Sequence, residues 1–256
     1  MRLPRIGGKK LYYLLKPEFE ERVIKCGRDK FLRVLRQECL LVKRRKNFTK
    51  TTQSYHRFNK HPNLVMGTTI SRQEQVWVSD ITYIRTRQGF MYLSLITDAY
   101  SKQIMGYNLS DNMKTESTTK ALKMALRNRR YPNTSLIHHS DRGFQYCSPD
   151  YIKVLDDNNI SVSMTTKYDP YENAIAERVN GILKNEFILD YGNINKPDAY
   201  RIVNQAINIY NFEMPHLSCD YLTPAQAHQF GDYELKSWSK NFSSKGYPLE
   251  ENEYYI

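Results

Sequence analysis

The sequence has few of the residues that mark disulfide-rich, zinc-binding, collagen-like or membrane proteins. Its 256 residues include only four cysteines, which are far apart and form no C-x-x-C motif, so neither a structural zinc site nor a disulfide framework is expected. Glycine and proline are also scarce, at 11 and 10 residues, which excludes a collagen-like chain. No apolar run approaches the roughly 18 residues that would span a bilayer. No apolar stretch opens the chain either, so we expect a cytoplasmic protein without an export signal or a membrane span.

Positive charge is abundant and is concentrated in the first quarter of the chain. Residues 1–70 hold 18 Lys and Arg against 5 Asp and Glu, a net charge of +13, whereas residues 71–256 carry −2. The densest run is Lys43, Arg44, Arg45 and Lys46. A short basic run is most often a solvated loop, but a charge asymmetry of this size favours nucleic-acid phosphates as the partner. We therefore expect Lys43 to Lys46 to contact DNA.

The apolar pattern predicts a small helical segment followed by an α/β core. Residues 1–68 read as two short helices, near 11–15 and 29–36, with a break or a new first turn at Pro17, and then a basic arm and a polar linker. Together they form a partial helix-turn-helix-like, DNA-binding segment. Residues 69–230 form the core and residues 231–256 a tail.

The order of elements in the core predicts its sheet. Three strands (76–85, 90–97 and 103–109) read as an antiparallel meander. A helix (114–130), a strand (135–139), a helix (148–157), a strand (160–166) and a helix (173–189) follow, and two more helices (197–214 and 223–230) come after them. This order predicts a mixed five-stranded sheet flanked by helices.

Three carboxylates stand where a metal site could form. Asp80 lies inside an apolar strand, where an unpaired charge is costly unless it is metal-bound or solvated. Asp141 follows the strand 135–139, and sites tend to form at the carboxyl ends of strands in open α/β sheets. Glu177 lies one turn into the helix 173–189. A single carboxylate in any of these three positions would more often be an ordinary solvated charge. The prediction of a metal site therefore depends on the three carboxylates together.

The helix that carries Glu177 has an apolar and a polar face. The apolar stripe consists of Ile175, Val179 and Ile182. The opposite stripe consists of Asn173, Glu177, Asn180 and Lys184. We therefore expect Glu177 to look towards the site, with Asn173 and Asn180 beside it as DNA contacts.

Other residues compete for these roles. Asp98, at the end of the second strand, and Asp169 and Glu172, in the loop before the last core helix, are alternative carboxylates. His138 and His139 could serve as ligands or general bases, but we expect one to be packed and the other to be hydrogen-bonded near the site.

A set of carboxylates suits Mg²⁺, which prefers oxygen ligands and is commonly held together with a substrate phosphate. Two such ions about 3.5–4 Å apart can clamp an in-line phosphoryl displacement. No nucleophilic side chain is then required, because water or a DNA hydroxyl attacks. We expect two Mg²⁺ ions per site, for which Mn²⁺ would substitute.

Three blocks of the sequence resemble the DDE transposases of the bacterial IS3 insertion-sequence family. They are residues 77–83 (WVSDITY), 139–143 (HSDRG) and 169–178 (DPYENAIAER), with 35 residues between Asp141 and Glu177. Weaker matches follow at Lys184, Tyr210-Asn211, residues 215–218 (PHLS) and Thr223-Pro224. The resemblance extends over residues 5–230.

The resemblance implies a ribonuclease-H-like, integrase-type core in which Asp80, Asp141 and Glu177 bind the metal ions and Lys184 touches DNA near the reacting phosphate. It implies a transposase that nicks the ends of an insertion sequence and transfers the released 3′-hydroxyl to another phosphodiester. The implied partners are transposon ends and target DNA, an upstream-frame protein or a frameshift fusion with it, and further copies of the chain on DNA. The implied location is the bacterial nucleoid.

Two other interpretations remain open at this point. A metal-dependent nuclease of the same fold would release cut ends and never join them. A non-catalytic DNA-binding protein, such as an inactive remnant, would bind DNA whether or not the three carboxylates are intact. An assay for strand joining separates the transposase from the nuclease, and DNA binding without any metal-dependent product would indicate the non-catalytic protein.

Overall fold

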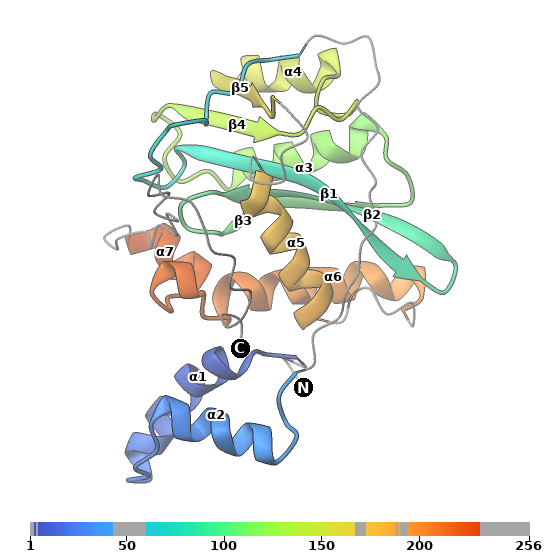
Figure 1. The fold of residues 1–256 in the computed structure, drawn as a ribbon. Helices are drawn as coiled ribbons and strands as arrows, with labels where there is room; N and C mark the ends of the chain where they lie inside the picture. The colour runs from blue at the N-terminus through green and yellow to red at the C-terminus, as the bar shows by residue number, and fades with distance from the viewer. Residues whose placement is uncertain are drawn as a thin grey trace, which may run out of the picture.

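A mixed five-stranded sheet forms the centre of the molecule (Figure 1). The computed structural model describes residues 3, 5–42, 60–166, 173–187, 189 and 194–230. The strand order is β3-β2-β1-β4-β5, in which β1 pairs antiparallel with β2 and parallel with β4. The sequence prediction of this sheet is confirmed. The strands are β1 (Val76–Thr86), β2 (Gly89–Asp98), β3 (Ile104–Ser110), β4 (Leu136–Ser140) and β5 (Ile160–Met164).

Helices cover both faces of the sheet, and each face has its own apolar core. On one face, α3 (Thr115–Arg127) and α4 (Pro149–Asp156) pack around Trp77, which is fully buried. On the other, α5 (Ala174–Glu186) and α6 (Lys196–Phe212) pack around Ile84. The short η2 (Leu217–Cys219) and α7 (Pro224–Phe230) follow α6. None of the described helices is both long and apolar enough to cross a bilayer.

The N-terminal segment is a pair of helices with a small core of its own. In α1 (Gly8–Glu21) and α2 (Arg28–Gln37), the buried Phe31, Leu32 and Leu35 meet apolar residues of α1. The predicted break at Pro17 is wrong, because α1 continues through it. A proline removes one helical hydrogen bond, but Leu15 and Phe19, on either side of it, pack against α2 and hold the helix together. Residues 43–59, which include the basic run Lys43 to Lys46, lie outside the described residues.

The segment that was expected to be a linker packs partly on the core. The backbone N–H of Met164 in β5 donates to the carbonyl of Pro62 at 3.2 Å, and the N–H of Leu64 donates to Ser163 Oγ at 2.8 Å. Val65 and Ile70 pack against a small apolar cluster around Val76. Residues 62–70 therefore continue the core at the β5 edge.

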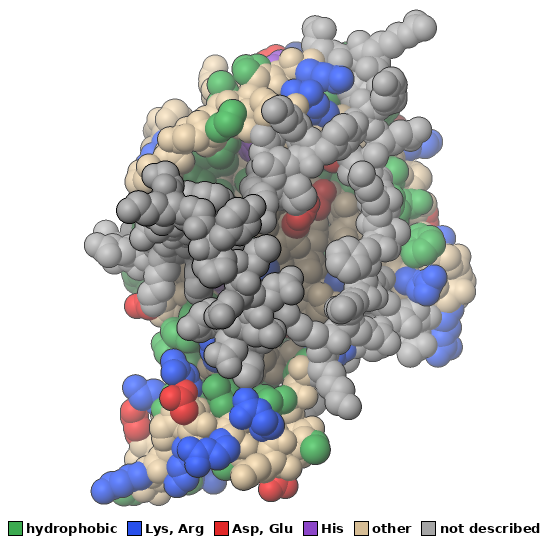
Figure 2. Space-filling view, viewed as in Figure 1, with side chains coloured by type: hydrophobic (Ala, Val, Ile, Leu, Met, Phe, Trp, Pro, Cys, Tyr) green, Lys and Arg blue, Asp and Glu red, His purple; other side chains and the backbone are tan. Residues whose placement is uncertain are grey.

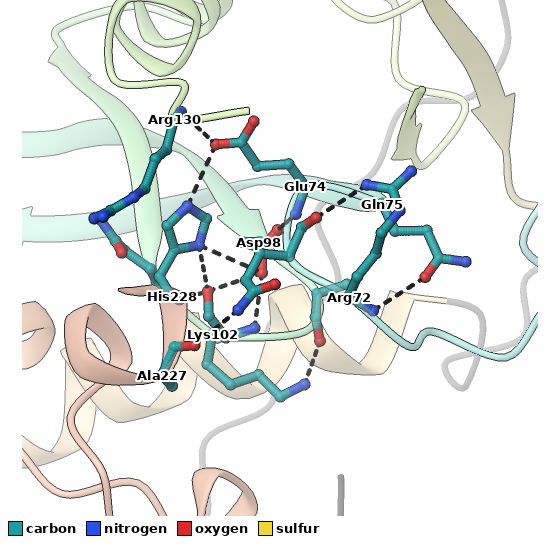
Figure 3. Close-up of polar contacts among 12 residues, drawn as sticks. Arg72, Glu74, Gln75, Asp98, Lys102, Arg130, Ala227 and His228 are labelled. Carbon is teal, nitrogen blue, oxygen red and sulfur yellow. Dashed lines mark hydrogen bonds and ion pairs between the residues drawn. The ribbon is translucent and has the colours of Figure 1, made fainter. Parts of the chain in front are cut away.

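A buried polar cluster joins α7 to the sheet where β1 begins and β2 ends (Figure 3). Glu74 and Asp98 are fully buried and His228 of α7 is 4% exposed. Glu74 Oε1 accepts from the N–H of Arg130 at 2.6 Å and lies 3.3 Å from His228 Nε2, while Glu74 Oε2 accepts from Arg129 Nε at 3.2 Å. Because the side chain of Arg129 and the backbone N–H of Arg130 donate to Glu74, α3 ends at Arg127 and not at Arg130 as the sequence predicted.

The cluster gives His228 an unusual charge state. Burial alone would lower the pKa of His228, but hydrogen bonds and charges from Asp98 and Glu74 outweigh it and raise this pKa to about 9. The pKa of Glu74 is lowered, because bonds from His228, Arg130 and Tyr131 together outweigh its burial. The protonated imidazole thus lies between two carboxylates and fastens α7 to the sheet.

Substitution of Gly106 tests the contact of α3 with β3. A Cβ at Gly106 would collide with the carbonyl oxygen of Ala121 and lie 2.5 Å from the nitrogen of Ala125, both in α3. Overpacking against backbone cannot relax cheaply, so Gly106→Ala is expected to lower the free energy of unfolding by about 2 kcal/mol or more. Urea unfolding measures this change. The matched control is Gly181→Ala in α5, where nothing lies within 4 Å of the new methyl group. An undiminished stability for Gly106→Ala would contradict the packing described here.

Stability should fall at alkaline pH through His228. Because the folded pKa of about 9 exceeds the ordinary 6.5, the stabilisation is complete below pH 6.5 and is lost as the pH rises through about 9. The expected loss is up to about 3 kcal/mol, measured by urea unfolding across this range. His228→Gln should start less stable and show a flatter alkaline slope. Equal alkaline slopes of stability against pH in the wild type and in His228→Gln would rule out a stabilising role of the protonated His228 imidazole.

Candidate metal and DNA site

The register of β1 and β4 places two of the predicted carboxylates side by side. The two strands are parallel, with Ser79 opposite Ser140. Asp80 is the next residue of β1, and Asp141 is the first residue after the end of β4, so the two follow this pair directly. Because neighbouring strands lie about 4.8 Å apart, their side chains start close together. A local sequence rule, a strand end followed by a turn, was enough to find Asp141.

The pKa of Asp80 is affected by burial and by the nearby charge of Asp141. Desolvation raises it most, and the charges of Asp141 and Glu177 add to the effect, so that the pKa of Asp80 reaches about 7. A hydrogen bond from Asn180 opposes the rise without cancelling it. The protein therefore holds a carboxylate in a position where its charge lacks full compensation from protein groups, which is the electrostatic signature of a cation site.

A glycine turn shapes the loop after Asp141. The N–H of Gly143 donates to Asp141 Oδ1 at 3.0 Å. A Cβ on Gly143 would lie 2.9 Å from the same oxygen, closer than real Cβ atoms approach. Glycine at this position lets the backbone curl around the carboxylate and fix its orientation.

The third predicted carboxylate approaches the pair from α5 without joining it. Glu177 is exposed in the first turn of α5, and its pKa is raised by desolvation. Its charge contributes to the raised pKa of Asp80. However, within the described part of the chain no three His, Cys, Asp or Glu side chains lie close enough together to share a metal ion. The structure thus brings Asp80 and Asp141 together and directs α5 towards them, and the three-carboxylate site remains a prediction.

Asn180 of α5 and Asn173, the N-cap residue of α5, bind β1. Asn180 Nδ2 donates to Asp80 Oδ2 at 2.6 Å, and Asn173 Nδ2 donates to the carbonyl oxygen of Ser79 at 3.1 Å. Their exposed fractions are 5% and 7%, which leaves no room for the direct DNA contact expected from the polar stripe. The helical pattern marked them as polar, but polarity alone could not show that their partner is a strand and not the solvent. The Oδ1 atoms of both are buried and have no hydrogen-bond partner among the residues that the structure describes.

The alternative residues separate clearly from the site. Asp98 accepts bonds from Ser101 and from the N–H of Glu74 in the polar cluster, so its role is structural. His138 Nε2 lies 2.7 Å from Ser79 Oγ and 2.9 Å from Tyr151 OH, and burial lowers the pKa of His138 to about 3. Asp169 and Glu172 lie outside the described residues.

His139 is fully buried, and its Nδ1 lies 2.8 Å from Ser163 Oγ. Both histidines are thus buried and hydrogen-bonded, whereas the sequence led us to expect one packed and the other hydrogen-bonded. Lys184 is partly buried two turns after Glu177, on the same side of α5.

Sequence reasoning missed Tyr146. The residue is 3% exposed, and its buried hydroxyl has no hydrogen-bond partner within the described part of the chain. Burial first, and then Tyr151, Asp80 and Asp141, raise the pKa of this phenol well above its usual value. Tyr146 is therefore a neutral hydroxyl within electrostatic range of the carboxylate pair. Nothing local in the sequence distinguishes it from the other tyrosines.

Comparison with known proteins identifies the family. Models described as "Integrase core domain" match residues 71–170 and 158–224. A 31 kDa protein of insertion element IS600 from Shigella sonnei is 38% identical over 213 residues, which are 82% of this chain and 78% of that protein. The transposase InsF of insertion sequence IS3A from Escherichia coli K12 is 34% identical over 194 residues, which are 75% of this chain and 67% of that protein.

The fold has relatives among solved structures. A chain of the simian T-cell lymphotropic virus intasome, determined in complex with the PP2A regulatory subunit B56 gamma, superposes with a TM-score of 0.53 at 16% identity. The match covers 96% of this chain and 81% of that one. It confirms the ribonuclease-H-like fold. The two insertion-sequence relatives and the family models together show that the chain belongs to the IS3 family of insertion-sequence transposases, with a DDE integrase-type core.

Proposed function

We propose that this chain is a metal-dependent DNA strand-transferase that nicks the ends of its insertion sequence and joins the released 3′-hydroxyl to a second phosphodiester. The observation that carries the proposal is the adjacency of Asp80 and Asp141 on two parallel strands, with α5 bringing Glu177 towards them. The relatives named as transposases supply the reaction class.

The donor set fits divalent cations. Two carboxylates on adjacent strands raise each other's proton affinity, and a nearby dication relieves that repulsion. Hard oxygen ligands are what Mg²⁺ prefers, and Mn²⁺ accepts the same donors. In the proposed site Asp80, Asp141 and Glu177 hold two ions. When bound, such ions polarise the scissile phosphate and stabilise the attacking and leaving oxygens of an in-line displacement.

The protein's own residues position these ligands. Asn180 orients the Asp80 carboxylate, and Asn173 ties the start of α5 to β1 beside it. Gly143 holds Asp141 from the other side. Lys184 and the run Lys43 to Lys46 supply positive charge to DNA phosphates. Further copies of the chain on DNA and an upstream-frame protein belong to the same proposal.

Removing a carboxylate tests the reaction and its metal site together. Asp141→Asn and Glu177→Gln are expected to lose strand transfer with Mg²⁺ by more than about 100-fold, because losing a group that merely orients a ligand already costs roughly 10- to 100-fold. Calorimetry with Mg²⁺ should show the same loss of binding. Glu116→Gln, at an exposed carboxylate in the first turn of α3, is the matched control. Wild-type cutting without joining would favour a nuclease, and DNA binding without any product would favour a non-catalytic protein.

Asn180 should affect metal affinity more than stability. Asn180→Ala removes the bond to Asp80 Oδ2, so Mg²⁺ affinity is expected to fall about 10- to 100-fold, with activity partly restored at high Mg²⁺. A titration of strand transfer against Mg²⁺ measures the shift. Asn208→Ala, at an exposed α6 residue that bonds only Asn204, should leave the titration unchanged. Identical Mg²⁺ curves for Asn180→Ala and wild type would exclude the orienting role.

A further inference from the structure

One sheltered ion pair joins the N-terminal helices to the helix that carries Glu177. Lys10 Nζ in α1 lies 3.0 Å from Glu186 Oε1 and 3.2 Å from Glu186 Oε2, at the end of α5. The two side chains are only 14% and 18% exposed. The pair Lys16–Glu20 within α1 is 56% and 69% exposed, and exposed pairs of that kind contribute little. The Lys10–Glu186 pair is therefore of a different kind from the surface pairs.

The charges of Lys10 and Glu186 each interact unfavourably with the dipole of the helix that contains them. Lys10 is in the first turn of α1 and Glu186 is the last residue of α5. A cation at a helix N-terminus and an anion at a C-terminus are each unfavourable. Neither residue therefore helps the helix that contains it, and the contact between the two helices is the interaction that accounts for their presence.

Two further contacts fix the orientation of the helix pair. The rings of Tyr13 in α1 and Tyr221 are stacked, with centroids 4.6 Å apart and planes at 11°. Leu3, just before α1, packs against the core around α5 and α6. Three contacts at different places allow little rotation of α1 on the core.

The outer face of α2 carries unpaired positive charge. Phe31, Leu32 and Leu35 face α1, and helical periodicity places Lys30 and Arg33 on the opposite side, with Arg36 at its edge. Asp29, which pairs with Arg28, lies between Arg33 and Arg36 on the helix surface. All three cations are exposed, and none pairs with a carboxylate within the described part of the chain. In Figure 2, Lys and Arg side chains are numerous over α1 and α2, and acidic side chains lie near the middle of the same face, level with the start of α5.

We propose that the Lys30, Arg33 and Arg36 face of α2 binds duplex DNA next to the reacting end, and that the Lys10–Glu186 pair fixes this DNA in register with the carboxylate site. The proposal rests on the proposed function, because register has meaning only where a phosphate reacts. Lys10 and Glu186 are positioning residues in it, since they touch neither DNA nor metal. They transmit the position of α2 to α5, and α5 carries Glu177.

The ion pair can be broken and rebuilt in the full-length chain. Lys10→Met and Glu186→Gln each break it, and Lys10→Glu combined with Glu186→Lys restores it with charges that now suit both helix dipoles. Lys16→Met, the same change at the exposed pair of α1, is the control. The probe is an end-labelled duplex taken from the DNA that flanks this gene and includes its terminal inverted repeat.

The readouts are the nick position, the product yield with Mg²⁺, the affinity, and a hydroxyl-radical footprint that needs no catalysis. The single variants should bind the duplex within about twofold of wild type, nick it at several neighbouring positions and yield roughly 10- to 100-fold less product, since misplacement by about 1 Å is enough for such a loss. In the footprint of the single variants, the DNA between the terminal repeat and the nick site should lose its protection from cleavage. The reversed pair should restore one position and one continuous footprint.

Two results would overturn the coupling between the ion pair and the DNA register. In one, the single variants nick at the wild-type position with the wild-type yield. In the other, the charge-reversed double variant nicks at as many positions as the single variants do. A wild-type chain that forms no product would refute the proposed function, and the footprint would still decide the coupling. Changing Lys30, Arg33 and Arg36 together to Gln should reduce the slope of log affinity against log salt by about 2–3. An unchanged slope would overturn the DNA face on α2.

Discussion

The parallel pairing of β1 with β4 is the constraint on which the site depends. It sets Ser79 opposite Ser140 and so brings Asp80 beside Asp141, although 61 positions of sequence separate them. A shift of one residue would turn one of the two carboxylates to the other face of the sheet. Buried residues on both strands oppose such a shift, among them Trp77 and His138, which are opposite one another in the pairing. The two like charges are thus forced together by the packing of the apolar core.

Glu74 and Asp80 show how hydrogen-bond donors change the pKa of a buried carboxylate. Around Glu74, donors from Arg129, Arg130, Tyr131 and His228 satisfy the charge, and the pKa falls. At Asp80 the donors are fewer, a second carboxylate is adjacent, and the pKa rises to about 7. Burial is common to both residues. They differ in how far protein donors compensate the negative charge, and the cations proposed above would supply that compensation at Asp80.

The sequence predicts the sheet well because its strands have local signals. Alternation and turn residues marked each strand, and the Asp141 position followed from a strand end before a turn. The polar cluster had no such signal, since Glu74 and His228 are 154 residues apart and each reads as an ordinary polar residue. The asparagines of α5 failed for a related reason. A helical wheel sorts residues by polarity, and it cannot show that Asn180 is turned inward by a bond to a buried aspartate. The break predicted at Pro17 failed because tertiary packing outweighed a local preference.

Helix α5 is the element that ties these observations together. Its first turn carries Glu177, its middle is bonded to Asp80 through Asn180, and its last residue holds Lys10. At 1.5 Å per residue, its 13 residues span about 20 Å, close to the width of a DNA duplex. A shift at either end of so short a helix is passed to the other with little loss, because packed helices move as rigid bodies. The same helix can therefore set the distance between the carboxylates and the distance from them to the basic N-terminal helices.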